Sequence, residues 1–302
     1  MSALQLPRLP GATGSQEILI PQLAGVALAV ARSVRPGETL LLIAPAAGSV
    51  TGLIEEIRYF ADPDLPVRAL PDWELLPYDS FSPHPDIVAA RIRTLADLAR
   101  RQSQGVLVAP ITALMQRLPP PGALAWIGRW KPGDMLRRSA FIKQLISTGY
   151  VRVESVAAAG EYAVRGSVLD VFIGTAGAPI RIELDGDEVV SLRRFDPETQ
   201  RSGAPEEAVR LLPGREYPFT EAARDAFLHQ WRCTFEGESE RAPIYRQVEA
   251  GIPPAGIEFY LPLFYPEMAS LPDYLGENAR IVALGDWRAA ADAHWRHIEQ
   301  RR

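Results

Sequence analysis

Three short apolar runs constrain the fold of this chain more than any other feature of its sequence. They lie at 39–44, 105–109 and 279–284. The first two runs are continuous rather than alternating and the third is interrupted only by Arg280, a pattern typical of strands buried on both faces of a parallel sheet. The first two runs are separated by an alternation of helical patterns and a further strand, which predicts crossover connections (helices at 48–60 and 86–101, a strand at 67–70).

The last of the three runs stands far along the chain from the other two. A buried strand cannot stand alone, so we expect it to rejoin the first sheet. The residues between carry a different pattern, a helix at 134–147 followed by closely spaced strands, which predicts a small α+β domain with a mainly antiparallel sheet. We therefore predict a discontinuous α/β domain, made of residues 1–126 and 214–302, with an inserted domain at 127–213.

Within the inserted domain, two segments have clear faces. The predicted helix should bury an apolar set (Met135, Leu136, Phe141, Leu145 and Ile146). Residues 180–185 alternate apolar and charged side chains, so the charged ones, Arg181 among them, should face outward. A three-residue turn at 185–187 would pair Ile182 with Val190 and so keep apolar residues opposite one another.

Composition narrows the class of protein. The chain has 302 residues and a formal net charge of −5, which argues against a protein that binds nucleic acid simply by being basic. Its single cysteine excludes a disulfide framework and a Cys-based zinc site. We find no apolar run long enough to span a membrane and no signal-peptide pattern, so we expect no membrane partner and a cytoplasmic location.

A parallel sheet raises the question of a nucleotide-binding loop. A P-loop needs a lysine and a hydroxyl residue after its glycines, and no lysine precedes Lys131. Residues 11–16 look like a fragment of such a loop, but no strand precedes them and we interpret them as a linker. Gly25, Val26 and Ala27, before the strand at 39–44, are the remaining candidate for a degenerate nucleotide site, although the alanines around them favour a packed helix.

Other catalytic arrangements are also weak. Ser80, Ser82 and His84 lie in a turn-rich, proline-flanked stretch. His294 and His297 are spaced to share a helix face, but no third metal ligand accompanies them. We therefore expect no catalytic residue, no metal site and no cofactor in this chain.

Several segments, in one order along nearly the whole chain, resemble the bacterial transcription-repair coupling factors (Mfd). They include LPDWELLPYDSFSPH at 70–84, LMQR at 114–117, GEYAVRG at 160–166, SLRRFD at 191–196 and PAGIE at 254–258. The resemblance implies a UvrB-like first domain that retains a degenerate P-loop, helicase-like ATPase fold, interrupted by an inserted domain. It also implies that the motor, with its ATP and magnesium, and the contacts with RNA polymerase and DNA belong to regions downstream of this sequence.

The same resemblance implies a partner for the inserted domain. In UvrB and in this family that domain binds UvrA, the damage-recognition ATPase, so residues 127–213 should recruit UvrA to stalled transcription complexes. Arg165 and Arg181 match the family's binding surface, and an arginine fork can bind a carboxylate with two hydrogen bonds. The family tends to carry an aromatic residue late in the same strand, where Leu184 and Asp185 stand here, so Leu184 is a candidate replacement anchor.

Alternatives remain open at this point. Both arginines could form ordinary surface ion pairs, for instance with Glu161 or Glu183. The chain could be an active nucleotide-dependent DNA enzyme, which the missing lysine argues against. It could also be an enzyme acting on a small molecule at the strand ends near Pro45 and Pro110, where the small and apolar residues argue against catalysis. Contact with other domains of a longer protein could cover the UvrA surface.

Overall fold

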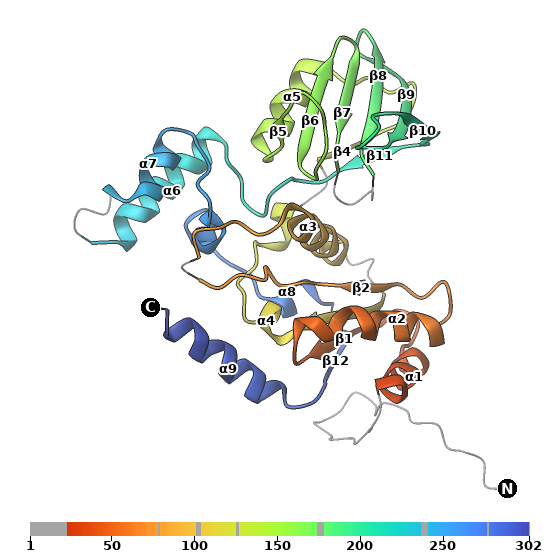
Figure 1. Cartoon of the computed structure of the whole chain (residues 1–302), viewed down its shortest axis with the longest axis vertical. Coiled ribbons are helices and arrows are strands. Elements are labelled where there is room, and N and C mark those ends of the chain that lie inside the picture. Colours follow the sequence, from red (N-terminus) through yellow and green to blue (C-terminus); the bar gives the residue numbers. More distant parts are fainter. Residues whose placement is uncertain are drawn as a thin grey trace, which may run out of the picture. The chain divides into compact units, whose positions relative to one another are not determined.

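The computed structural model describes residues 23–77, 79–100, 104–124, 127–173, 178–236, 241–276 and 278–301. It is an α/β structure with one parallel sheet and separate, mainly antiparallel sheets (Figure 1). The chain divides into two compact units. The first contains the described residues up to Asp72, those of 97–116 and those from Ser270 onward, and the second contains those of 73–96 and 117–269.

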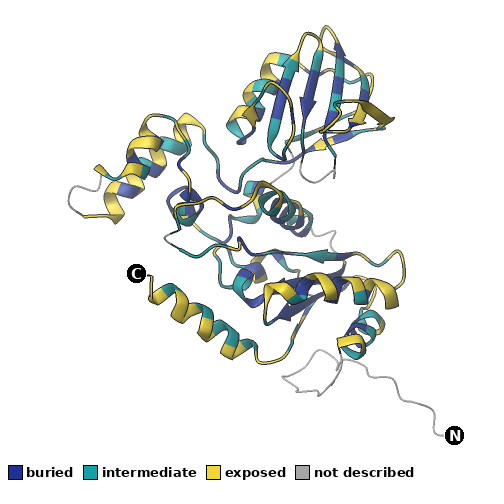
Figure 2. Cartoon of the chain, viewed as in Figure 1, coloured by how far each residue is buried: buried dark blue, intermediate teal, exposed yellow. Residues whose placement is uncertain are grey.

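The first unit is built on a four-stranded parallel sheet in the order β12-β1-β3-β2. Every residue of β3 is buried, as is all of β1 after Thr39, and dark blue strands are visible in this sheet in Figure 2. β12 pairs with β1, so the prediction that the last apolar run rejoins the first sheet is confirmed. Its expected burial on both faces is wrong, because β12 lies at the edge of the sheet and only Arg280 among its residues is buried. The four strands are β1 (Thr39–Ala44), β2 (Val67–Ala69), β3 (Gly105–Pro110) and β12 (Ala279–Ala283).

Two helices, α1 (Leu23–Ser33) and α2 (Val50–Phe60), pack their apolar residues on one face of this sheet. Leu42 of β1 is fully buried in this core. Gly105 begins β3 with φ +120°, and a Cβ there would lie 2.3 Å from the carbonyl oxygen of Pro66, so the approach of the chain requires glycine. The unit also contains η1 (Ala47–Ser49), α4 (Ile111–Leu114), α8 (Leu271–Tyr274) and α9 (Trp287–Glu299).

The second unit contains a six-stranded sheet in the order β10-β9-β8-β7-β6-β5, antiparallel except for the pairing of β5 with β6. One face packs on α5 (Arg138–Ser147) to form an apolar core. The strands are β5 (Val151–Arg152), β6 (Glu161–Arg165), β7 (Val168–Val171), β8 (Ile180–Asp185), β9 (Glu188–Phe195) and β10 (Ser202–Pro205), with β4 (Gly128–Trp130) and β11 (Val209–Leu211) forming a separate two-stranded sheet.

Two expectations for this domain are wrong in detail. The helix begins at Arg138 rather than at residue 134, and two members of its expected apolar set, Met135 and Ile146, are 67% and 55% exposed. The β8–β9 hairpin has a two-residue loop, because Asp185 pairs with Glu188. A β-bulge in β9, just after that loop, restores the pairing of apolar residues, so the three-residue turn is not needed.

The division into units differs from the boundaries expected at 126 and 213, because residues 73–96 and 214–269 group with the inserted sheet. A buried ion pair ties these segments together: the Arg91 Nε lies 2.6 Å from Glu216 Oε1, and both side chains are almost fully buried. The Trp73 indole also donates to Glu216. The remaining elements of the unit are α3 (Pro85–Ala99, which continues into the first unit), η2 (Pro121–Leu124), α6 (Glu221–Thr234), α7 (Pro243–Glu249) and η4 (Ile257–Leu263).

Among the described residues, none of the helices is long and apolar enough to cross a lipid bilayer.

Candidate partner-binding surface

The face of the six-stranded sheet opposite α5, here called the polar face, carries three of the four expected partner-binding residues. Residues directly opposite one another in neighbouring strands lie on the same face. One row therefore runs across Ala163, Asp170, Arg181 and Arg193, and the next runs across Arg165, Val168, Glu183 and Ser191. Asp185 lies two residues after Glu183 on β8, so its side chain is on the same face.

Arg181 is held inside the domain. Its Nε and Nη2 donate to the two carboxylate oxygens of Asp170 at 2.8 and 2.9 Å, and Nη1 donates to Ser202 and to the carbonyl of Gln200. The guanidinium also lies over the ring of Phe195. The hydrogen bond to Asp170 raises the pKa of Arg181, and the arginine side chain is only 16% exposed. The guanidinium group of Arg181 therefore links Asp170 of β7 to residues 200–202 at the edge of the sheet.

Arg165 lies at the exposed end of β6, with Nε and Nη2 donating to the carbonyl oxygen of Glu154 at 3.3 and 2.7 Å. The two glutamates considered as its surface partners have other contacts. Glu161 accepts the backbone N–H groups of Ala157 and Ala158, and Glu183 accepts the Ser191 hydroxyl. Arg165 is thus a cation presented on the polar face by backbone contacts.

Leu184 and Asp185 lie on opposite faces. Leu184 is 5% exposed and belongs to the core packed against α5, so it is not an apolar anchor on the polar face. Asp185 is exposed at the hairpin end of β8. The alternation of the sequence already places Leu184 with Ile180 and Ile182, and only the resemblance had suggested a surface role for it.

The three residues of the candidate nucleotide site lie in a helix rather than in a loop. Gly25, Val26 and Ala27 lie within α1, before β1, and Ala27 is fully buried. A phosphate-binding loop instead follows a strand and opens a helix. That position is occupied here by residues 45–49, between β1 and α2, where the sequence Pro-Ala-Ala-Gly-Ser has no lysine. The candidate at 11–16 lies outside the described residues, and a degenerate P-loop origin stays a prediction.

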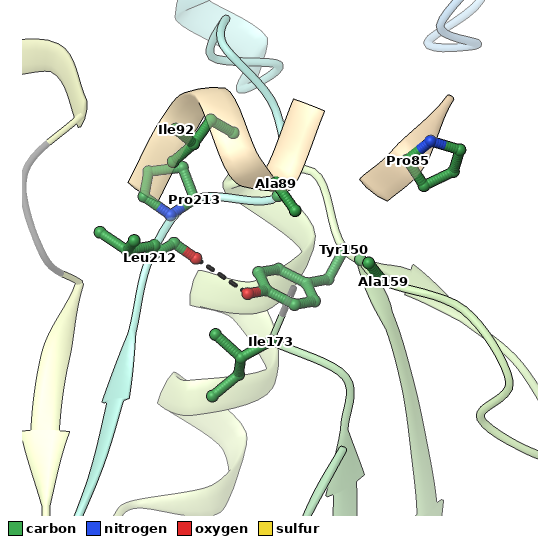
Figure 3. Close-up of a pocket in the computed structure, with 10 residues that line it drawn as sticks. Pro85, Ala89, Ile92, Tyr150, Ala159, Ile173, Leu212 and Pro213 are labelled. Atoms are coloured by element: carbon green, nitrogen blue, oxygen red, sulfur yellow. Dashed lines mark hydrogen bonds between the residues drawn. The ribbon is translucent and has the colours of Figure 1, made fainter. Parts of the chain in front are cut away.

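In the part of the chain that the structure describes, no group of three or more His, Cys, Asp or Glu residues is placed to hold a metal ion. A small cavity of about 20 Å³ in the second unit has room for about one water molecule (Figure 3). Its one hydroxyl, that of Tyr150, donates to the carbonyl oxygen of Leu212 at 2.9 Å, and burial raises the pKa of this tyrosine. The cavity is therefore a packing feature and offers no convergent catalytic groups.

Comparison with known protein families assigns this part of the chain to a class of domain. Residues 129–217 match the family model described as the UvrB interaction domain. The matched range contains the whole six-stranded sheet, α5, β11 and all of β4 except Gly128.

The chain as a whole is similar to transcription-repair-coupling factors. It is 42% identical over 289 residues to that of Escherichia coli, which covers 94% of this chain and 25% of the relative. It is 36% identical to that of Haemophilus influenzae over 98% of this chain and 26% of the relative. It is 30% identical to that of Myxococcus xanthus over 78% of this chain and 20% of the relative.

These comparisons confirm the resemblance to transcription-repair coupling factors that the sequence motifs indicate. The chain spans about a quarter of the length of the first two of these relatives.

Proposed function

We propose that this chain is the non-catalytic, UvrA-recruiting part of a transcription-repair coupling factor. The observation that carries the proposal is that the UvrB interaction domain match coincides with one folded sheet whose polar face stands opposite its core. UvrA would dock on that face within residues 127–213. Recruitment to stalled transcription complexes would then depend on RNA polymerase and DNA contacts made by the rest of a longer protein.

The proposed contacts follow from where the side chains lie. Arg165 and Asp185 are exposed on the polar face and would meet UvrA directly. Arg181 would contribute mainly by holding the sheet edge, since its donors are engaged with Asp170, Ser202 and Gln200. A charge-assisted hydrogen bond from Arg165 to a UvrA carboxylate would contribute about 1.5–3 kcal/mol.

We propose no nucleotide chemistry for this chain. The loop after β1 lacks the lysine that neutralises phosphate charge in a P-loop. ATP and magnesium would therefore act at the motor of the longer protein.

The test is a titration of purified UvrA with the whole chain, its Arg165→Glu variant and a matched Arg129→Glu variant. Arg129 is an exposed arginine of β4, in the separate two-stranded sheet. We expect the unchanged chain and Arg129→Glu to bind alike, and Arg165→Glu to bind about tenfold more weakly or worse. Arg181→Glu is a second variant, and its unfolding must be measured as well, because Arg181 also holds the edge of the sheet. Undiminished binding by both Arg165→Glu and Arg181→Glu would exclude this site.

A further inference from the structure

Two exposed apolar side chains lie at the hairpin end of the six-stranded sheet. Met135 is 67% exposed and Val190 is 55% exposed. Met135 stands opposite Glu188 in an antiparallel bridge, and Glu188 stands opposite Asp185. Because directly opposite residues share a face, these three residues extend the polar face by one row beyond Glu183.

The β-bulge explains why Val190 is exposed. Glu183 pairs with Ser191 and Leu184 pairs with Val189, so Val190 is the extra residue of β9. A bulge redirects the side chain at that point of a strand. Val189 remains fully buried in the core, whereas Val190 lies at the surface beside Ser191.

The charges beside these apolar residues indicate what would cover them. Asp185 and Glu188 are both exposed and stand directly opposite each other at the end of the hairpin. Like charges in this arrangement destabilise a strand pair. A basic side chain placed between the two carboxylates would relieve the repulsion, while an apolar side chain beside it would cover Met135 and Val190.

We infer that this hairpin end of the polar face is the apolar part of the UvrA-docking surface: Met135 and Val190 pack against an apolar residue of UvrA, and Asp185 and Glu188 take a neighbouring lysine or arginine. The inference rests on the proposed function. It extends that function from the row of Arg165 to the adjoining row, and it supplies the apolar contact that Leu184 cannot provide.

The test uses the whole chain with the double substitution Met135→Gln and Val190→Thr, which keeps the side chains close to their original size. The control is Ile146→Thr, because Ile146 is also 55% exposed but lies on α5, which packs on the opposite face. We expect the double variant to bind UvrA about tenfold more weakly and the control to stay within about twofold. Thermal unfolding of each variant should remain close to that of the unchanged chain.

A second pair, Asp185→Asn with Glu188→Gln, tests the charges. Removing them should weaken binding by about threefold and reduce its dependence on salt, since rim charges act mainly through screened attraction. If the unchanged chain fails to bind UvrA, the proposed function fails. If Arg165→Glu weakens binding while the Met135 and Val190 double variant does not, this inference alone is overturned. A double variant that changes only self-association would also overturn it, because the occupant would then be a second copy of the chain.

Discussion

The two large sheets of this protein differ in how far the side chains of their central strands are buried. In the parallel sheet, β1 and β3 are apolar runs buried on both faces, so their side chains contact only the interior. In the six-stranded sheet, β8 alternates buried and more accessible residues, with Ile182 in the core and Arg181 and Glu183 on the polar face. A partner protein can therefore contact side chains along the strands of the six-stranded sheet. It can contact the parallel sheet only at its loops and edge strands.

This difference explains where binding is proposed. The loop after β1 carries only small residues and a proline, which provide neither charge nor a deep pocket. The polar face carries an exposed arginine, a partly buried ion pair and an exposed apolar pair within adjoining rows. Substitutions in the parallel sheet should therefore affect packing, and substitutions on the polar face should affect binding.

The largest expected effect on stability comes from a substitution in the parallel sheet. Leu42→Ala removes a fully buried side chain from the core between the parallel sheet and its helices. The resulting cavity should lower the free energy of unfolding by about 3–5 kcal/mol. Denaturant unfolding measures the loss, and the fraction that remains folded should bind UvrA normally. A specific loss of affinity would show that the two roles are not separate.

The next effect comes from the ion pair on the polar face. Arg181→Ala leaves the Asp170 carboxylate, whose side chain is 1% exposed, without its bidentate partner. We expect a loss of about 2–3 kcal/mol in unfolding free energy, reduced from that of a fully buried pair because Arg181 is partly exposed. Arg193→Ala, an exposed arginine of the same row, should change stability by less than about 0.5 kcal/mol. Equal effects from the two variants would contradict the structural role given to Arg181.

A smaller effect is expected at the β8–β9 loop. Gly186 has φ +60° and open space around its Cα, so Gly186→Ala introduces backbone strain without a clash. The cost should be about 1 kcal/mol, measured by denaturant unfolding. Gly122→Ala, where there is also open space but no positive φ is found, is the matched control and should be less costly.

The smallest effect concerns pH and lies outside both sheets. Burial raises the pKa of Glu258, whose carboxylate accepts a hydrogen bond from Ser82, above its ordinary value of 4.5. The folded state therefore binds a proton more tightly than the unfolded state, so this stabilisation is complete below pH 4.5 and is lost as pH rises through the folded pKa. Glu258→Gln should lose less stability than the unchanged chain between pH 5 and pH 7, as measured by unfolding at both values. An identical pH dependence would show that Glu258 titrates normally.

Much of the fold could be predicted from sequence patterns because burial on both faces leaves an unbroken apolar run. The runs at 39–44 and 105–109 correspond closely to β1 and β3, and the last run joins the same sheet. The alternation at 180–185 likewise predicted β8 and its two faces. The grouping of residues 73–96 with residues 214–269 could not be predicted, since it depends on side-chain contacts such as that of Arg91 with Glu216, which are distant in sequence.

The candidate site was predicted only in part, for a similar reason. The alternation predicts that Arg181 lies on the face opposite the core. It does not predict that Nε and Nη2 of Arg181 both donate to the carboxylate of Asp170 on the neighbouring strand. The exposure of Val190 depends on a bulge, which has no clear signal in an alternating sequence. The exposure of Met135 follows from the later start of α5, and helix boundaries are poorly defined by periodicity.

The most direct test of this account is a calorimetric titration of UvrA with three forms of the whole chain. These are the unchanged chain, Arg165→Glu on the polar face, and Ala47→Glu in the exposed loop after β1. The account predicts that the unchanged chain and Ala47→Glu bind with equal affinity and that Arg165→Glu binds at least about tenfold more weakly. Loss of binding in Ala47→Glu, with full affinity in Arg165→Glu, would contradict it and would move the binding surface to the parallel sheet.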